Sequence, residues 1–519
     1  MSEGKRDPAT AAVVIAALCV ASAALLVAGA DDEAASLLLN GFTATHAAGA
    51  AAPFEPVLYA PNRAFALGFL RVGAASLDLA VVHLPSAFPV WRATPARMGD
   101  WSRAATLTFD SGLVLTAGDG GGEELWRTLN TIGDTVVLLN SSNLVIRRYA
   151  KPLPAWQSFE HPSDTLVAGQ NFTAASPPLI SANRRFALRL GATFLALTME
   201  FYGGGGAATP TYWRHTALEE TPAQNATQRA QAQAPVYGRL DGRGFFGLYR
   251  DGGVGKEEIR VDVLSFDTFA QNVTAAAGGG AMFRRMTVDD DGNLRAYYWA
   301  DESKSWTPEY KAIAGRCQLP TSCGAYGLCV PGEAQCQCLT NTTTSSPPCG
   351  ADETTDLCSG DGQQAEFDVI RRTRVSVAYK EQLPFATNYT TAAECEAACA
   401  GNCTCWGALF NGASGYCYLV EFPVETMVYD ADDSKSGYFK VRRRAQNQTT
   451  RRAMSPGVKA ATAVVSLVLA SLVAAGAYTG YRMWERRRRR REGMVEQELA
   501  SGPYKDLKSM GSSNNSFKS

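Results

Sequence analysis

Cysteines are the side chains whose spacing in this sequence most clearly indicates chemistry. The chain has 13 of them, and all except Cys19 lie between Cys317 and Cys417. Clustered thiols form disulfides in an oxidising compartment or bind zinc as thiolates. The cluster holds an even number of cysteines, contains no histidine and lacks the C-x2-C pairs that structural zinc sites favour. We therefore expect a disulfide framework in a secreted or surface protein.

The cluster divides into two sets of six. In the second set, Cys395 and Cys399 are four residues apart, so on a helix they would share one face and could fix it to a neighbouring strand. Spacing alone leaves every pairing within a set open. The first set is Cys317, Cys323, Cys329, Cys336, Cys338 and Cys349, and the second is Cys358, Cys395, Cys399, Cys403, Cys405 and Cys417.

Other reactive side chains give little sign of catalysis. The four histidines are scattered (His46, His83, His161 and His215), and no serine-hydrolase, metalloprotease or phosphate-binding motif occurs. The run 289–291 holds three adjacent aspartates, which suit a solvated turn better than a pair of glycosidase carboxyls. We expect no catalytic residue, no metal site and no cofactor.

The two ends of the chain indicate membrane topology. Lys5 and Arg6 precede an apolar run and then Ala28-Gly29-Ala30, which is typical of a signal peptide over 1–30, with an uncleaved anchor as the alternative. The 22 uncharged residues 460–481 would span about 33 Å as a helix, enough for a bilayer. The run Arg486–Arg491 follows.

This pattern predicts a single-pass type I protein of the plasma membrane. Residues 31–459 would lie outside, with 443–459 as a juxtamembrane linker, and 482–519 would form a cytoplasmic tail. The tail has a formal charge of +5, whereas residues 31–481 carry about −6, which argues against a nucleic-acid partner outside the membrane. Tyr504 and Leu507 fit a Y-x-x-Φ sorting motif.

Eight N-x-S/T sequons precede the expected span, as in a glycosylated surface protein. They begin at Asn140, Asn171, Asn225, Asn272, Asn341, Asn388, Asn402 and Asn447.

Short apolar or alternating runs, punctuated by Gly, Asp, Asn and Pro, predict a mainly β chain from residue 37 to residue 313. Two strings are specific, namely Phe65-Ala-Leu-Gly-Phe69 and Trp156-Gln-Ser-Phe159-Glu-His-Pro162-Ser-Asp164-Thr165. Residues 37–173 thereby resemble the bulb-type lectin domain of plant S-locus glycoproteins and S-domain receptor kinases. The resemblance implies a β-prism fold, with a second lectin-like or S-locus glycoprotein-like domain over 174–313.

The resemblance continues through the cysteine cluster. Cys323-Gly-Ala-Tyr-Gly-Leu-Cys329 resembles an EGF-like module over 316–350, and Glu394-Cys-Glu-Ala-Ala-Cys399 resembles a PAN/apple domain over 356–442. For the PAN domain it implies disulfides Cys395–Cys417 and Cys399–Cys405, leaving Cys358 for Cys403. Family receptors carry a cytosolic kinase after the span, but the 38 residues that follow it here contain no kinase motif.

Active lectins of this family share the pattern Q-x-D-x-N-x-V-x-Y, in which polar side chains bind mannose hydroxyls. Three stretches match it partly. Residues 108–116 keep Asp110, residues 139–147 keep Asn143, and residues 289–297 keep Asp291, Asn293 and Tyr297. Because lost polar groups leave sugar hydroxyls unpaired, we expect mannose to bind weakly or not at all.

The resemblance favours a non-catalytic, receptor-like recognition protein. It would bind a glycan, peptide or protein ligand and act through a kinase-bearing co-receptor. Gly476-x-x-x-Gly480 offers a close helix–helix contact for a homo- or heterodimer. The alternative is a structural, wall-facing adhesin that holds polysaccharide without signalling.

Overall fold

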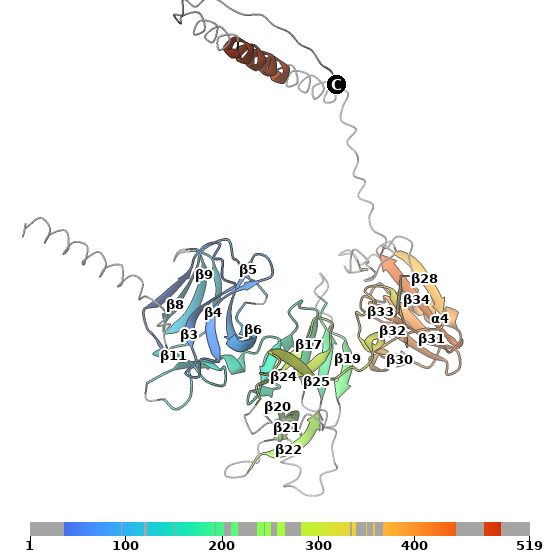
Figure 1. Cartoon of the computed structure of the whole chain (residues 1–519). Helices are drawn as coiled ribbons and strands as arrows, with labels where there is room; N and C mark the ends of the chain where they lie inside the picture. The colour runs from blue at the N-terminus through green and yellow to red at the C-terminus, as the bar shows by residue number, and fades with distance from the viewer. Residues whose placement is uncertain are drawn as a thin grey trace, which may run out of the picture. The chain divides into compact units, whose positions relative to one another are not determined.

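The computed structural model describes residues 36–442 and 472–488, except for 95, 119–121, 150, 192–193, 202–208, 216–235, 243, 251–256, 265–281, 333–334, 339–348, 350–356 and 359–366. The expected mainly β architecture is confirmed, and the strands fall into successive groups along the chain (Figure 1).

The first group forms three antiparallel sheets. One contains β3 to β6 with β7 beside β5, the second has the order β10-β9-β8-β2, and the third has the order β1-β11-β12-β13. The strands and 3-10 helices are β1 (Leu38–Leu39), β2 (Phe42–His46), β3 (Phe54–Tyr59), β4 (Phe65–Val72), β5 (Ser76–His83), η1 (Leu84–Ser86), β6 (Phe88–Arg92), β7 (Gly99–Asp100), β8 (Ala105–Asp110), β9 (Gly112–Ala117), β10 (Glu124–Arg127), β11 (Thr135–Leu138), β12 (Leu144–Arg147), β13 (Trp156–Gln157) and η2 (Ser158–Glu160).

One tryptophan from each sheet holds this group together. Trp91 of β6, Trp126 of β10 and Trp156 of β13 contact one another edge to face, with ring centroids 5.7 to 5.9 Å apart. The Nε1 of Trp91 donates to the carbonyl of His161, and the His161 ring stacks on Trp156. Because aromatic contacts of this kind add to the burial of large apolar area, the three rings fix how the sheets meet.

The second group repeats the three-sheet plan. Its sheets have the orders β14-β23-β24-β25, β15-β20-β21-β22 and β16-β17-β18-β19. The strands are β14 (Thr165–Val167), β15 (Asn171–Thr173), β16 (Leu179–Ile180), β17 (Phe186–Leu190), β18 (Leu195–Met199), β19 (Thr211–His215), β20 (Val236–Asp241), β21 (Phe245–Arg250), β22 (Ile259–Leu264), β23 (Arg284–Val288), β24 (Leu294–Ala300) and β25 (Ser305–Lys311).

The sequence analysis places the start of the second lectin-like domain at residue 174. Two strands of the second group nevertheless lie before that residue. Thr165 of β14 pairs with Thr287 of β23, and Phe172 of β15 pairs with Gly238 of β20. Strands of three residues carry too little periodicity to show which distant strand they join.

The cysteine-rich part contains two sheets and one helix. The sheet β27-β26-β33-β29 joins the two cysteine sets, because β26 pairs in parallel with β33. The other sheet has the order β28-β34-β31-β32-β30. The elements are η3 (Arg316–Gln318), β26 (Gly327–Val330), β27 (Gln335–Cys338), β28 (Phe367–Thr373), β29 (Val375–Val377), η4 (Lys380–Gln382), β30 (Phe385–Ala386), α4 (Ala392–Ala400), β31 (Gly407–Asn411), β32 (Tyr416–Val420), β33 (Thr426–Tyr429) and β34 (Lys435–Arg442).

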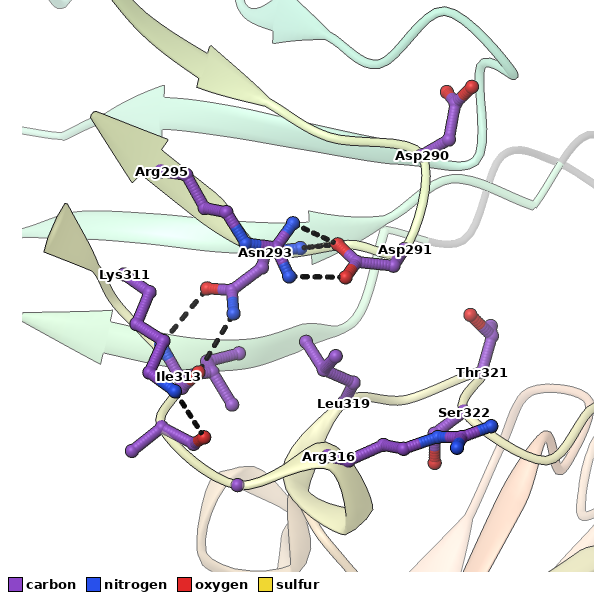
Figure 2. A pocket seen from close by; sticks show the side chains of 12 residues that line it. Asp290, Asp291, Asn293, Arg295, Lys311, Ile313, Arg316, Leu319, Thr321 and Ser322 are labelled. Carbon is purple, nitrogen blue, oxygen red and sulfur yellow. Dashed lines mark hydrogen bonds and ion pairs between the residues drawn. The ribbon is translucent and has the colours of Figure 1, made fainter. Parts of the chain in front are cut away.

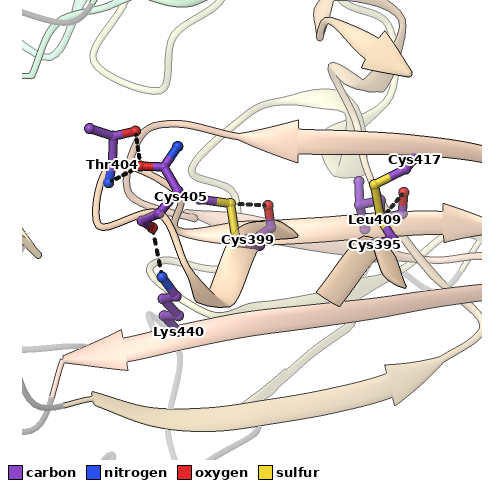
Figure 3. Close-up of a disulfide and its surroundings, with 9 residues drawn as sticks. Cys395, Cys399, Thr404, Cys405, Leu409, Cys417 and Lys440 are labelled. Carbon is purple, nitrogen blue, oxygen red and sulfur yellow. Dashed lines mark hydrogen bonds between the residues drawn. A yellow bond between two sulfur atoms is a disulfide. The ribbon is translucent and has the colours of Figure 1, made fainter. Parts of the chain in front are cut away.

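Six disulfides, three within each set, connect all twelve cysteines. The second set forms the same three pairs that the family resemblance implies, and two of them fix α4 to the neighbouring chain (Figure 3). The six bonds are Cys317–Cys329, Cys323–Cys336, Cys338–Cys349, Cys358–Cys403, Cys395–Cys417 and Cys399–Cys405. Each closed loop restricts the unfolded chain, which compensates for the small apolar core of this region.

Residues 472–488 form a helix. Among the described residues, no helix is both long enough and apolar enough to cross a bilayer. Residues 460–471 of the expected span lie outside the described residues, as do the expected signal peptide, Tyr504 and Leu507 of the sorting motif, and the sequons at Asn225, Asn272, Asn341 and Asn447.

Replacing Trp156 by alanine should lower the free energy of unfolding of the first group by about 3–5 kcal/mol, as truncation of a buried aromatic side chain does. Faster hydrogen exchange in β6 and β10, which carry the two partner tryptophans, would report this loss locally. Tyr149→Ala is the matched control because Tyr149 is 71% exposed. Equal exchange in the two variants would contradict the role assigned to the three rings.

Candidate carbohydrate-binding sites

The first candidate stretch forms the hairpin of β8 and β9. Asp110 ends β8 and is exposed, and Ser111 at the turn has φ 65°. Gly112 stands where the family pattern has asparagine, and a Cβ atom there would lie 2.9 Å from Oγ1 of Thr128. An asparagine at position 112 therefore does not fit unless Thr128 moves. The hairpin keeps the aspartate of the mannose pattern, Asp110, but lacks the asparagine that accompanies it in active lectins.

The second candidate stretch uses its asparagine internally. Asn143 is buried, its amide nitrogen donates to Oε1 of Gln157 at 2.8 Å, and its Oδ1 accepts from the Ser158 hydroxyl and the Phe159 amide. These contacts fix the Trp-Gln-Ser-Phe segment against the turn between β11 and β12. Asn143 thus stabilises the fold and has no free polar atom for a sugar.

The third candidate stretch runs through the turn between β23 and β24. The side chain of Asn293 makes two hydrogen bonds to the backbone of Ile313, with its Nδ2 donating to the carbonyl at 2.8 Å and its Oδ1 accepting from the amide at 3.0 Å. Asp291 accepts from the Asn293 amide at 2.9 Å. Asn293 is only 1% exposed, so it connects the turn to the segment after β25.

Arg295 stands where the family pattern has valine, and it neutralises the carboxylates of this stretch. Its guanidinium donates to Asp289 at 2.5 Å and to both carboxylate oxygens of Asp291. Tyr297 also donates to Asp289, at 2.7 Å. The acids that would bind sugar hydroxyls are therefore occupied by groups from their own strand.

Tyr297 also takes part in a cluster that joins the two strand groups. The guanidinium of Arg285 lies 4.1 Å from the centre of the Tyr297 ring, 3.8 Å from that of Phe88 and 4.6 Å from that of Trp306. Such cation–π contacts hold the cation among the three rings. Burial, together with the hydrogen bond to Asp289, raises the pKa of Tyr297 to about 12.

A cavity of about 530 Å³ opens beside this third stretch (Figure 2). Its cations are Arg295, Lys311 and Arg316, its carboxylates are Asp290 and Asp291, and its hydroxyls are Thr321 and Ser322. Lys311 donates to the Ala314 carbonyl at 3.0 Å, and Asp290 accepts from the Asn183 amide. Lys311 and Arg316 are exposed, so their charges face solvent at the cavity.

Sequence reasoning missed several residues of this cavity. Lys311, Arg316, Thr321 and Ser322 follow β24 in the chain and belong to no part of the mannose pattern. They approach the turn between β23 and β24 because Asn293 binds the backbone of Ile313. The signal that was available is Arg295, because a charged residue at the valine position indicates that the stretch no longer binds mannose in the usual way.

Comparison with known proteins places family matches on the same regions. The D-mannose binding lectin model matches residues 89–178, and the S-locus glycoprotein domain model matches residues 253–344. The PAN domain-containing protein At5g03700 of Arabidopsis thaliana is 36% identical over 464 residues, which cover 88% of this chain and 86% of that protein.

Two receptor-like kinases of Arabidopsis thaliana match a smaller share of their own length. The G-type lectin S-receptor-like serine/threonine-protein kinase At1g34300 is 24% identical over 70% of this chain and 42% of the kinase. The related kinase SD2-5 is also 24% identical, over 70% of this chain and 41% of the kinase. The chain therefore spans about two fifths of the length of these kinases.

Replacing Asn293 by alanine should remove both hydrogen bonds to Ile313 and lower the free energy of unfolding by about 2 kcal/mol, because the backbone groups of Ile313 lose their partner. Asp110→Ala is the matched control, since Asp110 is exposed. Chemical denaturation of the two variants gives the comparison. If Asn293→Ala unfolds at the same denaturant concentration as the wild type, the two hydrogen bonds of Asn293 do not stabilise the fold.

Proposed function

Because this chain belongs to the family of the PAN domain-containing protein At5g03700, we propose that it is a non-catalytic, receptor-like recognition protein of the plasma membrane. It binds its ligand outside the cell and acts through partner receptor kinases. The observation that carries the proposal is the similarity of 70% of this chain to each of two G-type lectin S-receptor-like kinases.

The cavity beside β24 is the best-supported ligand site. Three cations and two carboxylates line it. Arg295 is paired with Asp289 and Asp291, whereas Lys311 and Arg316 present exposed charges. Hydroxyls of Thr321 and Ser322 supply hydrogen bonds of the kind that sugars accept and donate. This combination favours an acidic oligosaccharide, in which uronic-acid carboxylates contact the two exposed cations, Lys311 and Arg316.

The ligand proposal is tested by calorimetric titration of the purified full chain in detergent. A uronic-acid oligosaccharide should bind, and Lys311→Ala/Arg316→Ala should weaken that binding at least tenfold, because each charge-assisted hydrogen bond contributes about 1.5–3 kcal/mol. Binding should also weaken as salt is added. Lys304→Ala is the matched control, because Lys304 is exposed and pairs with Asp301 away from the cavity lining.

Free mannose should bind only weakly or not at all in the same titration, because Asn143, Asn293 and Arg295 commit the polar groups of the pattern. Two results would overturn the ligand site: mannose binding at millimolar concentration or tighter, or an acidic sugar that binds the double variant as well as the wild type.

The signalling part of the proposal depends on contact with another chain. Gly476 and Gly480 lie in the helix 472–488, where a Cβ atom on either residue would meet no heavy atom within 4 Å. Small residues four apart allow two helices in a bilayer to approach closely. The PAN region, residues 356–442, is the second candidate contact surface.

Purification from plant membranes in mild detergent should recover a kinase-bearing receptor with the wild-type chain. If the helix makes the contact, the Gly476→Ile/Gly480→Ile variant should no longer recover the kinase. If the PAN region makes it, the variant that lacks residues 356–442 should no longer recover the kinase. Ala477→Ile is the matched control on the same helix. Recovery of no kinase with the wild type would favour the wall-facing adhesin, which should also tolerate deletion of residues 482–519.

A further inference from the structure

Three aromatic side chains form a cluster at the edge of the PAN-region sheet, and two of them are exposed. Phe385 of β30 and Tyr416 of β32 stack with ring centroids 4.9 Å apart, and Tyr418 lies beside Phe385 at 5.7 Å. Phe385 is 56% exposed and Tyr416 is 36% exposed. Aromatic rings left in water forgo the free energy that their burial would supply, so this platform is suited to a ligand that covers it.

A glycosylation sequon begins three residues after Phe385. Asn388-Tyr-Thr390 has its asparagine exposed. Phe385 pairs with Tyr418 and Ala386 with Cys417, so the chain that follows runs beside residues 415 and 416. A Cβ atom on Gly415 would lie 3.5 Å from the Tyr389 carbonyl, which agrees with this course. Three residues span at most about 10 Å, so the first sugars on Asn388 can reach the platform.

We propose that Asn388 carries an N-glycan whose first sugar rings pack on Phe385 and Tyr416. One face of a pyranose ring presents C–H groups, which are weakly positive, and the face of an aromatic ring is negative. The sugar therefore shields the exposed rings while its hydroxyls remain in water. The glycan acts as a covalently attached cover that stabilises β30 and β32.

The described sequons at Asn140 and Asn402 have no aromatic residue beside them, and Phe172, which follows Asn171, is buried. Asn140 lies in the turn between β11 and β12, where Leu139, Ser141 and Ser142 flank it without an aromatic ring. The Oδ1 atom of Asn140 accepts from the Asn62 amide, and that of Asn402 accepts from Thr404. Asn140 therefore serves as the control sequon, in the same protein but with no aromatic residue beside it.

The test compares substitutions of two asparagines in two backgrounds, using the full chain expressed in cells that attach N-glycans and purified in detergent. Mass spectrometry of glycopeptides should find sugar on Asn388. In the wild-type background, Asn388→Gln should speed hydrogen exchange in β30 and β32 several-fold, because a cover over these strands is lost. In the Phe385→Ser/Tyr416→Ser background the same substitution should change exchange little, which is the coupling that a double-mutant cycle isolates. Asn140→Gln should leave both strands unaffected.

A second measurement does not depend on how well the serine variant folds. An endoglycosidase applied to the native protein should remove the Asn388 glycan about tenfold more slowly than the Asn140 glycan, and Phe385→Ser alone should narrow that difference. The proposal is overturned if Asn388 carries no sugar, if exchange responds to Asn388→Gln equally in both backgrounds, or if both glycans are released at the same rate. A free platform would then be available to a protein partner.

Discussion

Closure of three sheets around three tryptophans is the interaction on which the first strand group depends. Each sheet has four or five strands, and apolar side chains from all three pack into one shared core. Trp91, Trp126 and Trp156 come from different sheets and contact one another within 6 Å. The three tryptophans therefore hold the loops in place without taking part in ligand binding. The sequences of those loops can change without loss of the fold.

The stretches that partly match the mannose pattern use most of their polar groups within the fold. Asn143 binds the backbone and side chains of the Trp-Gln-Ser-Phe segment, and Asn293 binds the backbone of Ile313. Arg295 pairs with two aspartates whose charges would otherwise face solvent. Asn143, Asn293 and Asp291 thus match the pattern but stabilise turns, whereas Asp110 is exposed. Retention of a motif residue is thus weak support for retention of its ligand.

Sequence reasoning predicted the type of fold and the disulfide-rich region well, because strand periodicity and cysteine spacing are local patterns. It assigned β14 and β15 to the first lectin region, whereas they pair with β23 and β20, more than 60 residues away in the chain. It named Asp291 and Asn293 but missed Lys311 and Arg316, because the segment after β25 approaches their turn only in the folded chain. Local patterns identify elements, and long-range backbone contacts decide which elements share a site.

The parallel pairing of β26 with β33 has a consequence for how the cysteine-rich region is made. Cys329 of β26 lies opposite Val428 of β33, about a hundred residues later in the chain. During synthesis the disulfides of the first set can close before the strand that completes their sheet has been made. The edge of β26 must stay unpaired during that interval, which exposes it to wrong partners. The region 316–442 therefore matures as one piece, and a chimaera that exchanges only one of its two cysteine sets would separate strands that belong to a common sheet.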